Sequence, residues 1–348
     1  MRTILATCLL LAWPLCAQAQ IRNRVNVNRL EHKLAGQLVD YTHNSGKDRR
    51  IYSPILGMPR DLYVYLPPCY DPRRAYPLVV YLHMAYVDEH TLPGSNRLVE
   101  LDRLIQEGRV PPVIVASPDG TLHGENRIRE PHSLFVNGVN GRFEDHLTQE
   151  VVPFLMRTYS IRPEREAHAA LGASAGGLGA MNLALKHRDV FGAVATLAGP
   201  LNLRYWNSDG NYRENFDPAT YRWNEHYDAD MVIARFYLGL SRVRASKYAA
   251  PVFGEGPGVT DRIKQSNPAD LLFATDLPPG ALAMYVNYPG RDNYNFDAQD
   301  ESFGWLAAQK GVTVELERVP CGRHNLPYFR SQHLPAWLWL GRHLLPPT

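Results

Sequence analysis

The sequence has little cysteine, little net charge and almost no long apolar runs. Only four of its 348 residues are cysteines, and two of them lie within the first twenty residues. It contains no Cys-x-x-Cys pair and no His/Cys cluster, so the pattern of these residues does not suggest a metal site. A formal net charge of +2 gives no electrostatic reason to expect binding to nucleic acid or to an anionic membrane surface.

The one long apolar run is at the amino terminus, MRTILATCLLLAWPLCAQAQ. A positive charge at Arg2, the apolar residues 4–15 and the small residues of Ala17-Gln18-Ala19 are typical of a secretory signal peptide, which we assign to residues 1–19. The run is too short for a typical transmembrane helix, and no later segment is as long and apolar. The bulky residues before Cys16 disfavour a lipidated cysteine. We therefore expect a secreted or periplasmic protein with no membrane span.

The remaining chain has the composition of a globular protein, with 45% hydrophobic and 21% charged residues over the full sequence. We expect residues 20–348 to form a single domain, with an insertion at about 201–270. The two remaining cysteines, Cys69 and Cys321, lie far apart in the sequence. In an oxidising compartment they either pair as a disulfide or remain as two buried thiols, and the second alternative is favoured.

Apolar strand patterns alternate with helical patterns along the chain. This order is typical of crossover units and predicts an α/β fold with a mostly parallel sheet. Pro153 is expected to disturb the first of the helices. Strands are predicted at 34–41, 60–66, 76–83, 113–116, 191–197, 281–288 and 312–319, and helices at 143–159 and 298–310.

The sequence Gly172-Ala173-Ser174-Ala175-Gly176 follows a short apolar run and precedes a helical pattern. A G-x-S-x-G motif in a strand-turn-helix context predicts a serine held on a strained turn at the carboxyl edge of a sheet. The first N–H groups of the following helix can stabilise an anion there. A Gly/Ala-rich loop that only packs a helix against a strand is the alternative. Ser174 is the predicted nucleophile, because acid and histidine candidates follow it in the order Ser, Asp, His.

The candidate acid and base lie on loops after late strands. Asp292 comes directly after the strand 281–288, and an acid there can orient a catalytic imidazole. Asp297 is the alternative acid, and Asp276 is a weaker one, whereas Asp300 and Glu301 are expected to face solvent. His324 follows the last strand, 312–319, and is the predicted general base. His83 and His333 are the next histidine candidates.

A predicted oxyanion hole needs two backbone N–H donors. One is expected from Ala175, directly after the nucleophile. The other is expected from the loop after the strand 76–83, at Met84 or Ala85. Many hydrolases have glycine at the position of Met84, so the shape of this loop is left open.

Residues 201–270 interrupt the strand and helix pattern with many aromatic side chains. In a hydrolase such an insertion is expected to form a cap over the nucleophile. Its aromatic side chains either stack on the sugar or phenolic rings of a substrate or form the cap's own core. The aromatic residues are Tyr205, Trp206, Tyr212, Phe216, Tyr221, Trp223, Tyr227, Phe236 and Tyr237.

Several segments together resemble the esterase D-like family, which includes S-formylglutathione hydrolases, feruloyl and acetylxylan esterases, siderophore esterases and mycolyltransferases. The segments are RDLYVYLPPCYDP, YPLVVYLH, VIVASPDG, FEDHLTQEVVPFL, GASAGG, PGRDNYNFDAQ and GRHN. The resemblance covers about residues 60–345 and is weakest in the cap. It implies an α/β-hydrolase fold and acyl-ester chemistry without a cofactor, carried by Ser174, the aspartate of GRD and His324. Relatives often have H-x-W where this chain has His324-Asn325-Leu326, which affects the expected leaving-group pocket.

These patterns predict an exported serine carboxylesterase that acts through an acyl-enzyme. Its substrate is expected to be a small-molecule or glycan-linked ester, with carbohydrate-linked or phenolic esters favoured. An acyltransferase that uses the same residues is one alternative. A non-catalytic relative that binds a glycan or a protein partner is another, and a peptidase is a third, although nothing in the sequence suggests an extended cleft.

Overall fold

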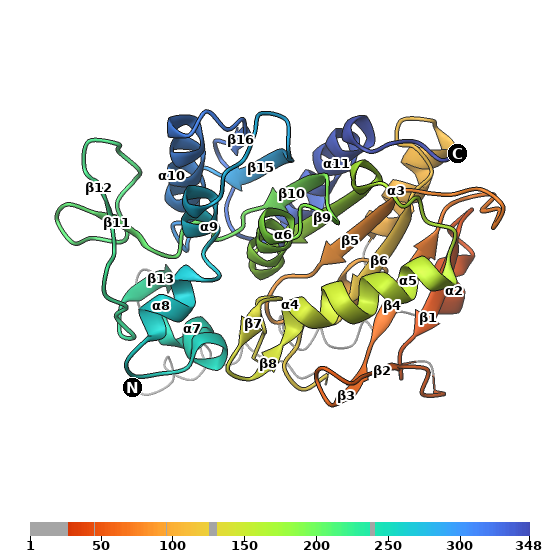
Figure 1. The fold of residues 1–348 in the computed structure, drawn as a ribbon, viewed down its shortest axis with the longest axis horizontal. Coiled ribbons are helices and arrows are strands. Elements are labelled where there is room, and N and C mark those ends of the chain that lie inside the picture. The colour runs from red at the N-terminus through yellow and green to blue at the C-terminus, as the bar shows by residue number, and fades with distance from the viewer. Residues whose placement is uncertain (1–26, 45, 95, 125–130, 237–240) are drawn as a thin grey trace, which may run out of the picture.

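The fold was obtained as a computed structural model, which describes residues 27–44, 46–94, 96–124, 131–236 and 241–348 (Figure 1). The predicted signal peptide therefore lies outside the described residues. A central sheet of eight strands crosses the molecule in the order β1-β4-β6-β5-β9-β10-β15-β16. The strands are β1 (Gln37–Tyr41), β4 (Leu62–Leu66), β5 (Leu78–Leu82), β6 (Ile114–Pro118), β9 (His168–Ala173), β10 (Ala193–Leu197), β15 (Ala283–Pro289) and β16 (Glu315–Val319).

The sheet is mostly parallel, as predicted. β4 pairs antiparallel with both β1 and β6, whereas the pairs from β6 to β16 are all parallel. The middle strands β5, β6, β9 and β10 are buried along their whole length. Their continuous apolar sequences follow from this burial, because side chains on both faces of the sheet meet a helical layer.

Helices cover both faces of the sheet (Figure 1). α5, α6 and α10 contribute to one apolar cluster, and α3 and α11 contribute to the other. The longest helix, α11, begins after Asn325, whose side chain accepts a hydrogen bond from the backbone N–H of Tyr328. The helices of these layers are α3 (Asn96–Gln106), α5 (Val152–Thr158), α6 (Ala175–Lys186), α9 (Pro268–Ala274), α10 (Phe296–Gln309) and α11 (Leu326–His343).

The helix predicted at 143–159 contains the expected disturbance at Pro153. It consists of α4 (Phe143–Asp145), a π-helical segment (His146–Val151) and α5. Val152 donates its backbone N–H to the carbonyl of Leu147, five residues earlier. Pro153 has no N–H to donate and its ring clashes with the carbonyl four residues before it, so a wider turn at this point accommodates it.

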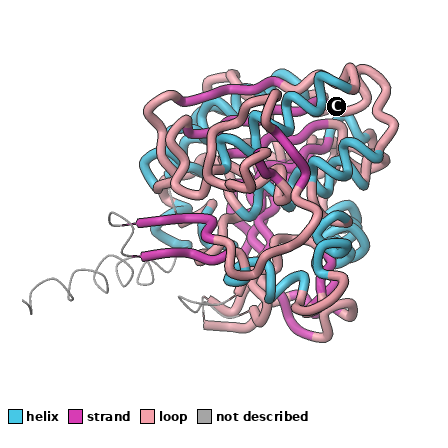
Figure 2. Tube along the Cα trace, turned by 90° about the vertical axis from the view of Figure 1, so that its left-hand side faces the viewer, coloured by secondary structure: helices cyan, strands magenta, loops and turns pink. Residues whose placement is uncertain are grey.

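The described residues of 201–270, where we predict an insertion, lie on the left in Figure 1 and face the viewer in Figure 2. The insertion is built from two short hairpins and two short helices. Val252, Phe253, Val259 and Ile263 of its helices pack with Ala175 and Leu178 of α6. Its elements are β11 (Tyr205–Asn207), β12 (Tyr221–Trp223), β13 (Val232–Phe236), β14 (Ser241–Arg244), α7 (Ser246–Phe253) and α8 (Val259–Lys264).

The remaining elements are short and lie outside the central sheet. The hairpin of β7 and β8 reaches the insertion, because the N–H of Val139 donates to the carbonyl of Val252 at 2.8 Å. These elements are α2 (Val27–Glu31), β2 (Ile51–Ser53), β3 (Met58–Arg60), η1 (Glu89–Thr91), β7 (Asn137–Gly138), β8 (Gly141–Arg142) and η3 (Arg165–Ala167).

Candidate active site

Ser174 lies at the sharp turn between β9 and α6. Its backbone has a φ of 51° and a ψ of −119°, in a region that residues with a Cβ rarely adopt. A Cβ on Gly172 would lie 1.9 Å from the carbonyl oxygen of Gly176, and a Cβ on Gly176 would lie 2.1 Å from that of Leu82. Small residues are therefore required on both sides of Ser174, in agreement with the strand-turn-helix geometry that the motif predicts.

The structure brings the predicted serine, histidine and first-choice aspartate together. The hydroxyl oxygen of Ser174 lies 3.0 Å from Nε2 of His324, and Nδ1 of His324 lies 2.9 Å from Oδ2 of Asp292. The Asp292 side chain is fully buried, and its other oxygen accepts a hydrogen bond from the backbone N–H of Tyr294 at 2.7 Å. This is the order of groups that lets a carboxylate orient an imidazole beside a nucleophilic hydroxyl.

Sheet topology explains how residues far apart in sequence meet. β9, β10, β15 and β16 are consecutive parallel neighbours, so their carboxyl ends share one edge of the sheet. Ser174 follows β9, Asp292 follows β15 and His324 follows β16. The predicted residues therefore converge because each one lies on a loop at the same edge.

The two alternative acids occupy different positions. Asp297 lies in the first turn of α10, and Nδ1 of His324 is bonded to Asp292 and not to it. Burial raises the pKa of Asp297 to about 6, and the negative charge of Asp292 adds to the effect. Asp276 is exposed and precedes β15, so it lies toward the opposite edge of the sheet from Ser174.

The expectation that Asp300 faces solvent is wrong. Its side chain is fully buried within α10, and neither carboxyl oxygen has a well-oriented hydrogen-bond partner. Burial, together with the nearby charges of Asp292 and Asp297, raises the pKa of Asp300 well above its usual range, and only the backbone at Leu201 offsets this slightly. The carboxyl group is thereby favoured in its neutral form. Glu301, on the next position of the helix, is half-buried and lies 3.5 Å from Arg318.

The buried Asp300 carboxyl makes stability depend on pH. A carboxyl with a raised pKa in the folded state contributes most stability below its unfolded pKa, and that contribution is lost as the pH rises through the folded pKa. We expect Asp300→Asn to remove this loss, so that its free energy of unfolding exceeds that of the wild type increasingly from pH 5 to pH 8. The difference should grow by at most about 1.4 kcal/mol per pH unit. Urea denaturation of both proteins at several pH values measures this difference in the free energy of unfolding.

An exposed acid provides the control for this measurement. Asp276→Asn changes the same functional group at a solvent-exposed position, so its difference from the wild type should not vary with pH. A constant difference for both variants would contradict the assignment of Asp300 as a buried neutral carboxyl.

Aromatic rings enclose the imidazole of His324. The ring centroids of Tyr294, Phe296 and Phe329 lie 5.0, 5.3 and 5.0 Å from its own, each in an edge-to-face arrangement. These rings restrict the orientation of the imidazole and reduce its access to water. The sequence analysis did not identify them, although Tyr294 and Phe296 lie two and four residues after Asp292.

The predicted oxyanion donors lie around the same serine. Ala175 is the first residue of α6, and the first N–H groups of a helix have no carbonyl partner within it. Met84 and Ala85 line one cavity together with Ser174, Ala175 and His324. The start of α6 and the Met84–Ala85 loop thus line the same cavity as the hydroxyl group that would attack a substrate carbonyl.

The cavity beside Ser174 has a volume of about 310 Å³ and mostly apolar walls. One side is formed by the sheet-edge loops and the other by the insertion. Tyr227 is among the residues that line it, and its buried hydroxyl has no hydrogen-bond partner among the described residues. Tyr248 and Tyr294 also line it, with their hydroxyl oxygens 3.3 Å apart. The wall residues from the insertion include Leu203, Tyr212, Met231, Ile233, Ala249, Phe253 and Ile263.

Most aromatic rings of the insertion pack against one another. Tyr205 stacks on Tyr221 with a centroid distance of 6.0 Å, and Phe216 and Tyr221 both contact Trp305 of α10. These rings form the insertion's own core, which is one of the two alternatives for the aromatic residues. Tyr212 and Tyr227 line the cavity, so they lie where the other alternative, substrate contact, requires.

The side chains of the other two histidine candidates are fully buried. His333 lies within α11, with its Nε2 at 3.1 Å from the hydroxyl of Tyr81. His83 contacts the backbone at the ends of β5 and β6. Neither is in hydrogen-bond contact with the serine in the described part of the chain.

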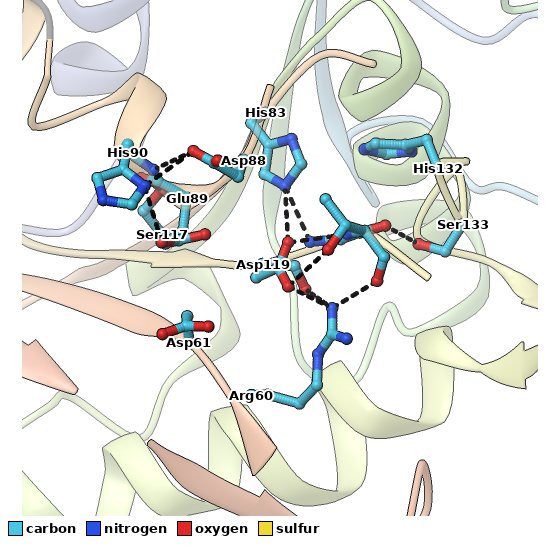
Figure 3. Close-up of polar contacts among 12 residues, drawn as sticks. Arg60, Asp61, His83, Asp88, Glu89, His90, Ser117, Asp119, His132 and Ser133 are labelled. Atoms are coloured by element: carbon cyan, nitrogen blue, oxygen red, sulfur yellow. Dashed lines mark hydrogen bonds and ion pairs between the residues drawn. The ribbon is translucent and has the colours of Figure 1, made fainter. Parts of the chain in front are cut away.

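The sequence analysis missed a compact group of three consecutive residues, Asp88, Glu89 and His90 (Figure 3). Nδ1 of His90 lies 2.9 Å from Asp88 and 3.0 Å from Glu89. Burial opposes the charge on His90, but the two carboxylates raise its pKa to about 10, whereas burial raises that of Glu89 to about 7. These side chains are of metal-ligating types, and their short contacts also form a buried ion-pair cluster.

The two cysteines of the described chain, Cys69 and Cys321, are both free and exposed. The alternative of a disulfide is therefore wrong, and so is the expectation that the free thiols are buried. Each lies on a loop, where a side chain need not enter the core. Among the described helices, none has the length and apolar character needed to cross a lipid bilayer.

The chain matches an esterase family in sequence and solved esterases in fold. The family described as Putative esterase matches residues 53–251. The uncharacterized protein YbbA of Bacillus subtilis (strain 168) is 25% identical over 154 residues, which make up 41% of this chain and 56% of that protein. The match thus spans little more than half the length of this relative.

Solved structures of esterases share the fold at low sequence identity. A ferulic acid esterase has 17% identity and a TM-score of 0.65, covering 89% of this chain and 100% of that one. The S-formylglutathione hydrolase of Agrobacterium tumefaciens has 15% identity and a TM-score of 0.60, with 90% and 97% covered. A ferulic acid esterase of Anaeromyces mucronatus has 15% identity and a TM-score of 0.54, with 88% and 90% covered. These likenesses support the α/β-hydrolase fold.

The family match covers more than half of the 348 residues and includes the serine turn. It thereby confirms the family that the sequence motifs resemble. The chain therefore belongs to the Putative esterase family, a family of serine carboxylic ester hydrolases with the α/β-hydrolase fold.

Proposed function

We propose that this protein is an exported serine carboxylesterase that forms an acyl-enzyme on Ser174. The observation that carries the proposal is the continuous hydrogen-bond chain from Ser174 through His324 to the buried Asp292, at the wall of a cavity. Export is supported by the signal-peptide pattern at residues 1–19.

In the proposed mechanism, the oxygen of Ser174 attacks the ester carbonyl while Nε2 of His324 takes its proton. Asp292 holds the Nδ1 proton of the imidazole, which keeps Nε2 free to accept and stabilises the imidazolium that forms. The N–H of Ala175 and one N–H from the Met84–Ala85 loop bind the oxyanion. The imidazolium then protonates the leaving alcohol, and the same groups activate a water molecule that releases the acid.

The cavity walls favour an ester with a sizeable apolar or aromatic part. A mostly apolar cavity of about 310 Å³ gains binding energy from ring or chain burial. The hydroxyl pair of Tyr248 and Tyr294 offers hydrogen bonds to a polar substituent. A phenolic ester, including one linked to a carbohydrate, fits this combination, and two of the similar structures are ferulic acid esterases.

A panel of esters tests this proposal. We expect the mature protein to hydrolyse p-nitrophenyl esters, and to prefer aryl-substituted acyl groups such as feruloyl over acetyl by about tenfold or more in kcat/KM, because the apolar walls contribute only to the larger group. Adding a sugar or alcohol acceptor and identifying the products by mass spectrometry separates hydrolysis from acyl transfer. Failure to turn over any ester, with no labelling by a fluorophosphonate, would contradict the enzymatic proposal and favour a binding protein.

A further inference from the structure

His83 lies at the end of β5, directly before the loop that contains Met84 and Ala85 (Figure 3). Its side chain is fully buried, and the proposed reaction uses it neither as acid nor as base. The rings of His132 and Phe135 lie 5.0 and 5.1 Å from it in edge-to-face contact. Burial of an imidazole is unfavourable unless both nitrogen atoms have hydrogen-bond partners. The partners of the His83 ring therefore indicate what it does at this position.

The hydrogen bonds of His83 assign its proton. The backbone N–H of Gly120 donates to Nε2 at 2.8 Å, so Nε2 must be an acceptor without a proton. The proton of the neutral ring therefore lies on Nδ1. This nitrogen is 2.9 Å from the backbone carbonyl oxygen of Met84 and donates to it. His83 thus connects the Gly120 backbone to the first peptide group of the loop beside Ser174.

A buried ion pair holds the Gly120 end of this connection (Figure 3). The guanidinium of Arg60 lies 2.7 Å from the carboxylate of Asp119 and also donates to the backbone carbonyls of Asp119 and Thr121. Both charged side chains are only 2% exposed. Burial opposes the charge on Asp119, but the guanidinium of Arg60 and the backbone N–H of Thr121 help to hold the pKa of that carboxyl well below its usual range. The partner of Nε2 is therefore firmly fixed.

We propose that His83 is a positioning residue that fixes the oxyanion loop and makes the N–H of Ala85 its donor. The peptide group between Met84 and Ala85 is planar and trans, so its carbonyl and its N–H point in opposite directions. His83 draws the carbonyl of Met84 toward the interior. The N–H of Ala85 consequently points the other way, toward the cavity that Ala85 shares with Ser174. This inference rests on the proposed esterase function and selects between its two candidate donors.

Two amide variants separate the two hydrogen bonds of His83. The amide nitrogen of asparagine can take the place of Nδ1, so His83→Asn keeps the donor to Met84 and loses the acceptor for Gly120. His83→Gln reaches the position of Nε2 and loses the donor to Met84. We expect His83→Gln to lower kcat for p-nitrophenyl acetate by about 100-fold with little change in KM, because an oxyanion donor is displaced. His83→Asn should keep kcat within about tenfold of the wild type.

Melting temperature and the rate of labelling by a fluorophosphonate are measured on the same proteins. Each variant loses one buried hydrogen bond, so we expect similar decreases in melting temperature, whereas labelling should slow mainly in His83→Gln. Equal activity of the two variants, or activity that only follows stability, would overturn the assignment of His83 while leaving the proposed function intact. A wild-type protein that neither hydrolyses esters nor reacts with the fluorophosphonate would overturn both.

Discussion

Replacing Ser174 with alanine is expected to lower kcat for p-nitrophenyl esters by about 10⁴-fold or more and to abolish labelling by a fluorophosphonate. The hydroxyl oxygen is the atom that would form the acyl-enzyme, and removing a nucleophile leaves only binding and the oxyanion hole to accelerate the reaction. The remaining rate should resemble that of a variant that lacks His324, because the serine and the imidazole act as one unit.

The same substitution should change the free energy of unfolding by less than about 1 kcal/mol. The backbone of Ser174 keeps its own contacts, since its N–H donates to the carbonyl of Leu197 and its carbonyl accepts from Gly177 and Leu178. Alanine is as small as the turn requires, and only the side-chain bond to His324 is lost. Thermal unfolding of both proteins checks this expectation.

Ser331→Ala is a matched control. Ser331 is an exposed serine on α11, and its hydroxyl donates to the carbonyl of Tyr328, away from the cavity. Its activity should equal that of the wild type within about twofold. If Ser174→Ala kept more than about 1% of the wild-type kcat, or still incorporated the fluorophosphonate, Ser174 would not be the nucleophile.

The serine turn could be predicted because its signals are local. A side chain at Gly172 or Gly176 would clash with backbone atoms a few residues away or on the neighbouring strand β5. The glycines of the motif therefore indicate the geometry of the turn directly. The meeting of Ser174 with Asp292 and His324 could also be predicted, because loops that follow parallel strands lie at one edge of a sheet. Only the existence and order of the strands was needed, and not their side-chain packing.

Burial on α10 could not be predicted in the same way. Asp300 is spaced three and seven residues before Phe303 and Ala307, which are buried, so helical periodicity places it on the inner face. A carboxylate nevertheless predicts a solvent-exposed position, because burial of a charge is unfavourable. Its neutral form removes that objection, but the burial that is the main cause of its raised pKa comes from tertiary structure.

The role of His83 likewise depends on contacts that sequence patterns do not contain. Its position after an early strand made it a weaker candidate for catalysis, and nothing local reveals that Gly120 donates to one nitrogen and Met84 accepts from the other. The insertion's aromatic rings illustrate the same limit, since composition cannot separate Tyr221, which packs in their core, from Tyr227, which lines the cavity.

Asp292→Asn is expected to lower kcat by about 10⁴-fold, whereas Asp297→Asn should lower it by less than about threefold. An asparagine at 292 can donate its amide to Nδ1 of His324, which moves the ring proton to Nε2 and leaves no acceptor for the proton of Ser174. Asp297 has no such contact with the imidazole, and one of its carboxyl oxygens has no hydrogen-bond partner. Both substitutions keep the size of the side chain, so the pair is matched.

Measurement of kcat from pH 5 to pH 9 sharpens this comparison. Burial raises the pKa of Asp297 to about 6, so the wild-type protein gains a negative charge near Asp292 between pH 5 and pH 7. In Asp297→Asn that charge is absent at every pH, so the two pH profiles should coincide near pH 5, diverge between pH 5 and pH 7, and stay apart by a constant ratio above pH 7. A loss of activity that is larger for Asp297→Asn than for Asp292→Asn would instead make Asp297 the acid that orients His324, with the bond to Asp292 replaced during catalysis.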